Sequence, residues 1–77
     1  MLFPNKLYSY DESVLSKLPV LLRILKRRPM SVKELYKQVQ WNVSGVDEFI
    51  DALDCLYALH KIAYDDEAGV IRYVVRD

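Results

Sequence analysis

Two side chains in this sequence are of the kinds that carry out nucleophilic and acid–base catalysis, a single cysteine and a single histidine. Cys55 and His60 lie five positions apart in one stretch of helical periodicity. Because each residue of an α-helix turns by about 100°, this separation directs the two side chains about 140° apart, so the thiol and the imidazole cannot hydrogen-bond. We therefore expect no catalytic residues, with Cys55 near a packing face and His60 interacting with the terminal carbonyls of a helix.

Metal and phosphate sites are not expected either. A zinc site needs three or four ligands, whereas this chain offers one thiol and one imidazole in total. The two glycines, Gly45 and Gly69, are isolated, so the sequence contains no glycine-rich loop that could cradle a phosphate. The sequence predicts no metal, no cofactor and no enzymatic activity.

The composition is that of one small domain. The chain has 77 residues, a formal net charge of +0 and one cysteine, which excludes an internal disulfide and favours a reducing, cytoplasmic setting. Its longest apolar stretch, 18–22, contains Pro19 and ends before Arg23, so we expect neither export nor a membrane span. We predict a single domain over residues 1–77, with residues 1–10 forming an extended N-terminal arm.

The first predicted helix lies between Asp11 and Arg28. Ser13 or Ser16 would cap it, and with Ser16 as the cap Pro19 falls in the first turn, where a missing N–H costs little. The apolar side chains of this segment cover an arc of about 220°, twice the ~100° stripe that one core contact needs. One flank of the helix is therefore left over for a partner or for a homodimer.

Two further helices follow. Ser31 and Glu34 form a capping box at the start of the second helix, which ends before Trp41. Ser44 is the expected cap of the third helix, which runs to Leu59 or His60. Its predicted core stripe is Val46, Phe49, Ile50, Leu53, Leu56 and Tyr57, with four carboxylates on the opposite side: Asp47, Glu48, Asp51 and Asp54.

The last segment changes from helical to alternating periodicity. Ile62 and Tyr64 alternate, residues 65–69 supply a turn with a glycine, and residues 70–75 are rich in β-branched and aromatic side chains, a pattern typical of a hairpin. The 29–30 step is suited to a short extra strand beside it. This order predicts a mainly α fold with a small β hairpin, a winged helix-turn-helix domain of three helices and a C-terminal wing.

The charges argue against the usual ligand of such a fold. No lysine or arginine occurs between Gln38 and His60, and the wing tip reads Asp65-Asp66-Glu67. Because duplex affinity depends largely on neutralising phosphates, we do not expect the third helix to bind duplex DNA.

Two other surfaces remain candidates for binding. A basic patch around the first two helices would accept a nucleic acid or an acidic partner, unless its residues only complement a helix dipole: Lys26, Arg27, Arg28, Lys33 and Lys37. Aromatic side chains form the second group, either as core covers or as interface anchors: Phe3, Tyr8, Tyr10 and Trp41.

Three segments resemble the small middle components, sixth class, of bacterial ABC-three-component (ABC-3C) systems. They are the opening Met-Leu-Phe-Pro-Asn-Lys, residues 29–36 and above all residues 49–62, which contain Ala-Leu-Asp and Leu-Tyr-Ala-Leu. The resemblance implies a winged-helix protein encoded beside an ABC-type ATPase and a larger effector-linked protein, in systems directed against phages or other invading DNA. Members of that family more often have a glycine where this sequence has His60.

The function that the residues and the resemblance jointly predict is that of an adaptor between those two proteins. Carboxylates of the third helix would steer a basic partner, and apolar anchors would hold it. The predicted contact residues are Asp47, Glu48, Asp51, Asp54, Val20, Ile24 and Trp41. The chief alternative is a small DNA-binding regulator that uses the basic patch, and a third is an enzyme accessory without binding of its own.

Overall fold

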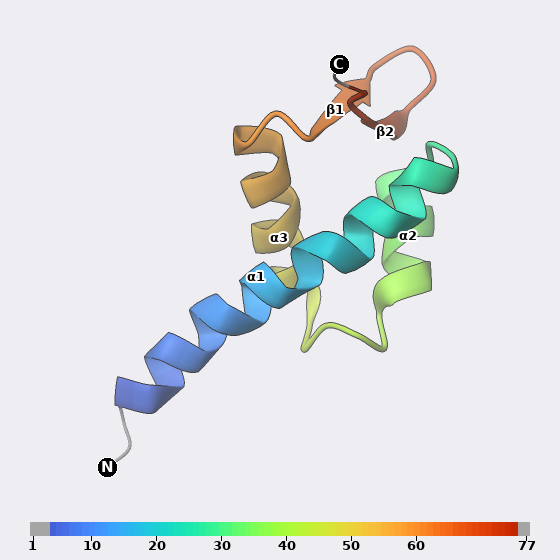
Figure 1. The fold of residues 1–77 in the computed structure, drawn as a ribbon. Helices are drawn as coiled ribbons and strands as arrows, with labels where there is room; N and C mark the ends of the chain where they lie inside the picture. Colours follow the sequence, from blue (N-terminus) through green and yellow to red (C-terminus); the bar gives the residue numbers. More distant parts are fainter. Residues whose placement is uncertain (1–3, 76–77) are drawn as a thin grey trace.

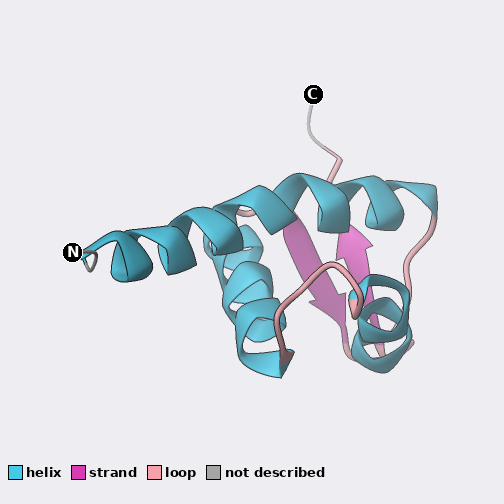
Figure 2. Ribbon diagram, turned by 90° about the horizontal axis from the view of Figure 1, so that it is seen from below, coloured by secondary structure: helices cyan, strands magenta, loops and turns pink. Residues whose placement is uncertain are grey.

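The fold consists of three helices followed by a two-stranded hairpin (Figure 1). The computed structural model describes the backbone of residues 4–75 and the side chains of residues 10–75. The elements are α1 (Pro4–Arg27), α2 (Val32–Val39), α3 (Val46–Ala58), β1 (Ile62–Asp65) and β2 (Val70–Tyr73). Helix α1 runs along one side of the molecule, with the other helices and the hairpin packed against it (Figure 2). This is the predicted mainly α architecture of a winged helix-turn-helix domain.

Helix α1 begins earlier than the sequence indicated. It starts at Pro4, so residues 4–10 are helical and the predicted extended arm is wrong there; residues 1–3 of that arm lie outside the described part. Proline favours the first helical position, because its fixed φ suits the helix and its missing N–H would have had no helical partner. Pro19 consequently lies inside α1. It removes a hydrogen bond to the carbonyl of Leu15, and both residues are exposed, so water can hydrate that carbonyl.

The short helix α2 begins as predicted. The hydroxyl of Ser31 accepts a hydrogen bond from the Glu34 amide at 3.1 Å. The reciprocal half of the predicted capping box is replaced by an ion pair, because the Glu34 carboxylate binds the guanidinium of Arg28. This contact lowers the pKa of Glu34 and raises that of Arg28. The pair ties the end of the α1 segment to the first turn of α2.

Helix α3 starts and ends differently from a simple capped helix. Gly45, rather than the predicted Ser44, is the N-cap residue, and no side chain caps the helix there. At the other end His60 has a positive φ of 61°. The His60 amide donates to the carbonyl of Tyr57 at 3.0 Å and the Lys61 amide to that of Leu56 at 2.9 Å, the pattern of a Schellman motif. The left-handed residue explains why glycine suits this position.

The hairpin, called the wing below, is antiparallel, and Ile62 pairs with Tyr73 at its base. At its tip the Asp65 carboxylate accepts bonds from the amides of Glu67 and Ala68, both at 3.1 Å, and Gly69 has a φ of 68°. The predicted turn is therefore confirmed, including its positive-φ glycine.

The extra strand expected at the 29–30 step is present as a single β-bridge. Met30 pairs with Ile71, with N···O distances of 3.3 and 2.7 Å for the two backbone hydrogen bonds. Both residues are buried. The bridge anchors the wing to the connection between α1 and α2.

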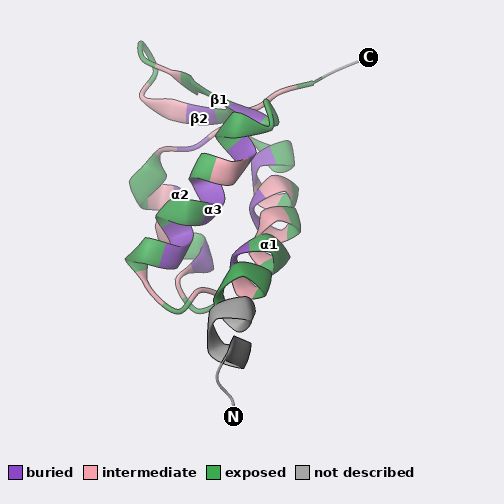
Figure 3. Ribbon diagram, turned by 90° about the vertical axis from the view of Figure 1, so that its left-hand side faces the viewer, coloured by how far each residue is buried: buried purple, intermediate pink, exposed green. Residues whose placement is uncertain are grey.

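The core lies between the five elements, and each of them contains buried residues (Figure 3). The buried Phe49 packs edge to face with the half-buried Tyr36, with ring centroids 5.0 Å apart. The buried apolar residues are Val14, Leu21, Leu25, Met30, Leu35, Val39, Phe49, Ala52, Leu53, Leu56, Ile62 and Ile71.

Candidate functional site

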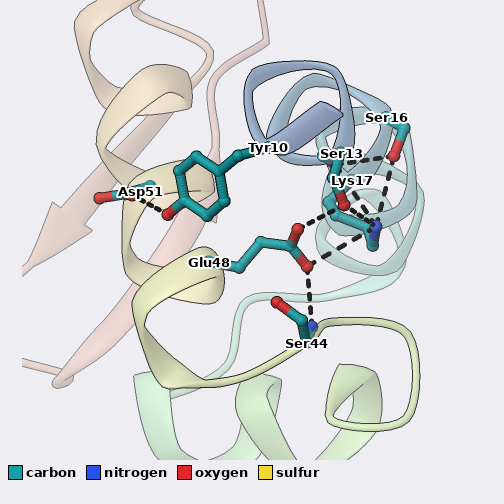
Figure 4. Close-up of polar contacts among 7 residues, drawn as sticks. All are labelled: Tyr10, Ser13, Ser16, Lys17, Ser44, Glu48 and Asp51. Atoms are coloured by element: carbon teal, nitrogen blue, oxygen red, sulfur yellow. Dashed lines mark hydrogen bonds and ion pairs between the residues drawn. The ribbon is translucent and has the colours of Figure 1, made fainter. Parts of the chain in front are cut away.

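A buried carboxylate joins α3 to α1. Glu48 is 2% exposed and accepts hydrogen bonds from the Ser13 hydroxyl and, at 2.8 Å, from the Ser44 amide; Lys17 Nζ lies 3.6 Å from its Oε1 (Figure 4). The bond from Ser13 is the main cause that lowers the pKa of Glu48, and the Ser44 amide and the Lys17 ammonium add to it. Glu48 therefore holds the helices together, and the prediction that it steers a partner at the surface is wrong.

A second polar contact between the same helices lies at the surface. The Tyr10 hydroxyl donates to the Asp51 carboxylate (Figure 4). This bond stabilises the protonated phenol and is the main cause that raises the pKa of Tyr10 to about 12. Tyr10 thus contacts α3 instead of extending from an arm; Phe3 and the side chain of Tyr8 lie outside the described residues.

The outward side of α3 is acidic. Asp47, Asp51 and Asp54 are exposed and lie on consecutive turns. At the wing tip Asp66 and Glu67 are exposed too. In a winged helix these two elements usually approach the DNA backbone, and here both would repel phosphates.

One wing carboxylate is neutralised within the wing itself. The guanidinium of Arg72 lies 2.9 Å from Asp65, and this contact, together with the Ala68 amide, lowers the pKa of Asp65. The net negative charge at the wing tip therefore comes from Asp66 and Glu67, the two residues that follow Asp65.

Beside the carboxylates, α3 exposes a row of apolar side chains whose helical spacing predicts a place in the core. Val46 is 55% exposed, Ile50 40% and Tyr57 59%. Their spacing of four and seven residues places them along one side of the helix. The buried stripe is instead rotated toward Glu48 and Ala52. The signal for this row was the width of the apolar arc on α3, which exceeds the ~100° that one contact needs.

A hollow lies at one end of this row, between α2, α3 and the wing. We call it the wing hollow; its volume is about 150 Å³, and it is lined by Val32, Leu53, Asp54, Tyr57, Ile62, Ala63, Tyr64 and Ile71. Its base consists of buried apolar side chains, and its rim carries the exposed rings of Tyr57 and Tyr64. Sequence periodicity could not reveal it, because four elements contribute to it: α2, α3, β1 and β2.

The residues of the predicted basic patch are all exposed, but two have partners within the chain. Arg28 pairs with Glu34, and the Lys26 ammonium lies 5.3 Å from the centre of the Tyr73 ring. Arg27, Lys33 and Lys37 complete the patch. Two of its five cationic side chains, Lys26 and Arg28, therefore help to hold the wing and α2 near the end of α1.

The three predicted apolar anchors differ in exposure. Trp41, in the turn after α2, is 87% exposed, which leaves the indole available to a partner. Val20 and Ile24 are half-buried and pack against the core. The exposed apolar residue of this part of α1 is instead Leu15.

The two residues considered for catalysis lie in different surroundings. Cys55 is half-buried against the core, and His60 occupies the left-handed position after α3. Within residues 10–75 no cluster of three or more histidine, cysteine or acidic side chains could hold a metal ion. Among the described helices, none has the length and apolarity needed to cross a membrane.

A comparison with protein families adds the context that the geometry lacks. The model of the family described as ABC-three component (ABC-3C) system Middle Component 7 matches residues 3–71. The chain belongs to this family. The resemblance to middle components is thereby confirmed, with the seventh class in place of the sixth. Neither the curated proteins nor the solved structures contained a match.

The matched region contains α3 with its acidic and apolar surfaces and every lining residue of the wing hollow. The match ends at Ile71, in β2, and thus includes α1, α2, α3 and β1. A middle component is by its family description one part of a system with further components. The exposed surfaces of this small fold are therefore where contacts with those components are to be sought.

Proposed function

We propose that this chain is a non-catalytic adaptor that connects the ABC-type ATPase of its system to a larger, effector-linked component. The adaptor would act in the cytoplasm, in a defence against phages or other invading DNA. Its partners would be those two proteins, and it would need no cofactor.

The observation that carries this proposal is the outer surface of α3. Three exposed carboxylates lie there beside exposed apolar side chains, a combination that repels phosphate and suits a protein partner. Asp47, Asp51 and Asp54 would steer a basic surface toward the helix, while buried apolar area would hold the complex. The exposed Trp41 is a further anchor in this proposal.

Co-expression of the chain with the ATPase and the larger component tests the adaptor role. We expect the three proteins to copurify, and we expect reversal of Asp47 and Asp51 to lysine to weaken this association. Reversal of both Asp66 and Glu67 at the wing tip is the matched control, since it reverses the same number of charges on exposed residues away from α3. Failure of the wild-type chain to associate with either protein contradicts the proposal.

The second candidate function is a DNA-binding regulator that uses the basic patch. The observation in its favour is the exposure of Arg27 at the end of α1 and of Lys33 and Lys37 in α2. Salt-dependent retardation of duplex DNA by the wild-type chain, lost when these residues are replaced by glutamate, would support it.

A further inference from the structure

We infer that the wing hollow receives an apolar side chain from a basic amphipathic segment of a partner protein. This inference rests on the proposed function, because it names the surface through which the adaptor would bind and the chemistry of what it binds. Its basis is the size of the hollow, the charge at its rim and the row of apolar side chains that continues from it.

The size of the wing hollow suits one apolar side chain. Its volume is about 150 Å³, a space of the order that takes a benzene-sized group in an apolar protein cavity. Leu53, Ile62 and Ile71 supply a buried apolar base. The rings of Tyr57 and Tyr64, both more than half exposed, stand at the rim, where an entering side chain would cover them.

The negative charge at the rim of the hollow determines which residues of the partner can flank the entering side chain. Asp54 lines the hollow and is the one charged residue among its described lining residues. A lysine or arginine beside the entering side chain would pair with Asp54, and a glutamate there would be repelled. Asp47 and Asp51 extend the same negative field along the helix.

The apolar row of α3 indicates the shape of the partner segment. From Tyr57 in the hollow the row continues to Ile50 and Val46, with the three carboxylates alongside it. A helix laid beside α3 would match this surface if its own apolar stripe were bordered by cations. α3 has 13 residues, which at about 1.5 Å per residue offers a contact some 20 Å long.

A second copy of this chain fits the same surface less well. A symmetric dimer would bring the wing hollow and the carboxylates of both copies face to face, so Asp47, Asp51 and Asp54 would oppose like charges. The charge pattern therefore favours a different, basic partner.

Two designed peptides test the chemistry of the hollow directly. Both are helical 16-mers with leucine on one stripe; one carries lysine and the other glutamate on the flanks. Titrated into the ¹⁵N-labelled 77-residue chain, the lysine peptide should shift the amide signals of Val32, Tyr57, Tyr64 and Ile71, and the glutamate peptide should bind at least tenfold more weakly. Equal binding of both peptides, shifts confined to other surfaces, or no binding would overturn the inference.

Matched variants separate the hollow from general charge effects. Asp54→Lys and Tyr64→Ala should each weaken binding of the lysine peptide at least tenfold, whereas Asp66→Lys should change it less than twofold. Amide spectra of each variant show whether the fold is kept. If Asp54→Lys and Asp66→Lys weaken binding equally, the hollow has no specific role and the inference fails.

The reconstituted complex distinguishes this inference from the adaptor role. If the complex forms and tolerates Asp54→Lys and Tyr64→Ala, the adaptor stands and the hollow is not its contact. If the complex never forms but the lysine peptide still binds in the hollow, the adaptor role fails and the peptide-binding surface stands. Light scattering gives the oligomeric state, and a dimer whose interface covers the hollow would overturn the assignment of a basic partner.

Discussion

The carboxylate of Glu48 in α3 accepts a hydrogen bond from the hydroxyl of Ser13 in α1, a residue 35 positions earlier in the chain. Lys17, one turn further along α1, adds its positive charge on the same side. A buried acid in the first turn of the helix that would otherwise read DNA thus fixes the orientation of that helix. Because Glu48 is held in this way, α3 turns its aspartates and its apolar row outward.

Replacing Glu48 with glutamine should destabilise the chain and reduce its sensitivity to acid. Loss of the ionised acceptor should lower the free energy of unfolding by about 1–3 kcal/mol near pH 7. The pKa of Glu48 is lowered from its ordinary 4.5, so the unfolded state binds more protons in the range between the folded pKa and 4.5. The stabilisation that the ionised Glu48 contributes is complete above that range. It is lost as the pH falls through the pKa of Glu48 in the folded chain. Urea titrations from pH 7 to pH 3 measure both effects.

The control for this prediction is Glu12→Gln, which removes the same charge from an exposed position on α1. It should change the free energy of unfolding by less than about 0.5 kcal/mol. If Glu48→Gln keeps the full acid sensitivity of the wild type, the carboxylate does not have the role assigned to it.

Replacing His60 with glycine should stabilise the fold. His60 has a φ of 61°, a region that costs a residue with a Cβ about 1–2 kcal/mol. Glycine avoids that cost but loses more backbone freedom on folding, so a net gain of about 0.5–1 kcal/mol is expected. Thermal and urea unfolding measure it. His60→Ala keeps the strain, and an equal gain from alanine would show that the left-handed backbone is not the cause.

Trp41 should contribute little to the stability of the isolated chain and should report on binding. Since its side chain is 87% exposed, Trp41→Ser should change the free energy of unfolding by less than about 0.5 kcal/mol. Because it is the sole tryptophan, its fluorescence should move to shorter wavelength if a partner covers it. An emission maximum that does not move on formation of the complex would exclude Trp41 from the interface.

Reversing charge on α3 should create affinity for duplex DNA that the wild type lacks there. With Asp47 and Asp51 replaced by lysine, we expect non-specific binding whose salt dependence steepens by about two in the slope of log K against log salt. Fluorescence anisotropy with a labelled duplex measures this slope. Lys33→Glu with Lys37→Glu in the wild-type background is the counterpart, and a large loss of wild-type binding there would favour the basic-patch regulator.

Several features set by neighbouring residues were predicted correctly from the sequence, although the start of α1 at Pro4 and the N-cap of α3 at Gly45 were not. The cap at Ser31 depends on an amide three positions away, and the turn before Gly69 depends on a local backbone conformation. The pairing of Met30 with the wing was predicted because winged-helix domains often have a short extra strand that pairs with the hairpin. Local chemistry and fold class therefore account for the order and type of the elements.

The face that α3 buries could not be read from the sequence. A helical wheel shows relative angles only, and on it Val46, Ile50 and Tyr57 are as suited to a core as Phe49. What turns the helix is the contact of the Glu48 carboxylate with two side chains of α1, the donating hydroxyl of Ser13 and the ammonium of Lys17. This is a long-range contact with no local signal in the sequence. The same limit applies to the wing hollow, which exists only once α2, α3 and the wing have come together.

The β-bridge between Met30 and Ile71 gives the molecule a mechanical property. The hairpin cannot pivot away from the α1–α2 connection without breaking two backbone hydrogen bonds in a buried place. Two proteins bound to the hairpin and to α1 would therefore be held at a fixed distance from each other. The domain would then act as a rigid spacer between them and not as a flexible linker.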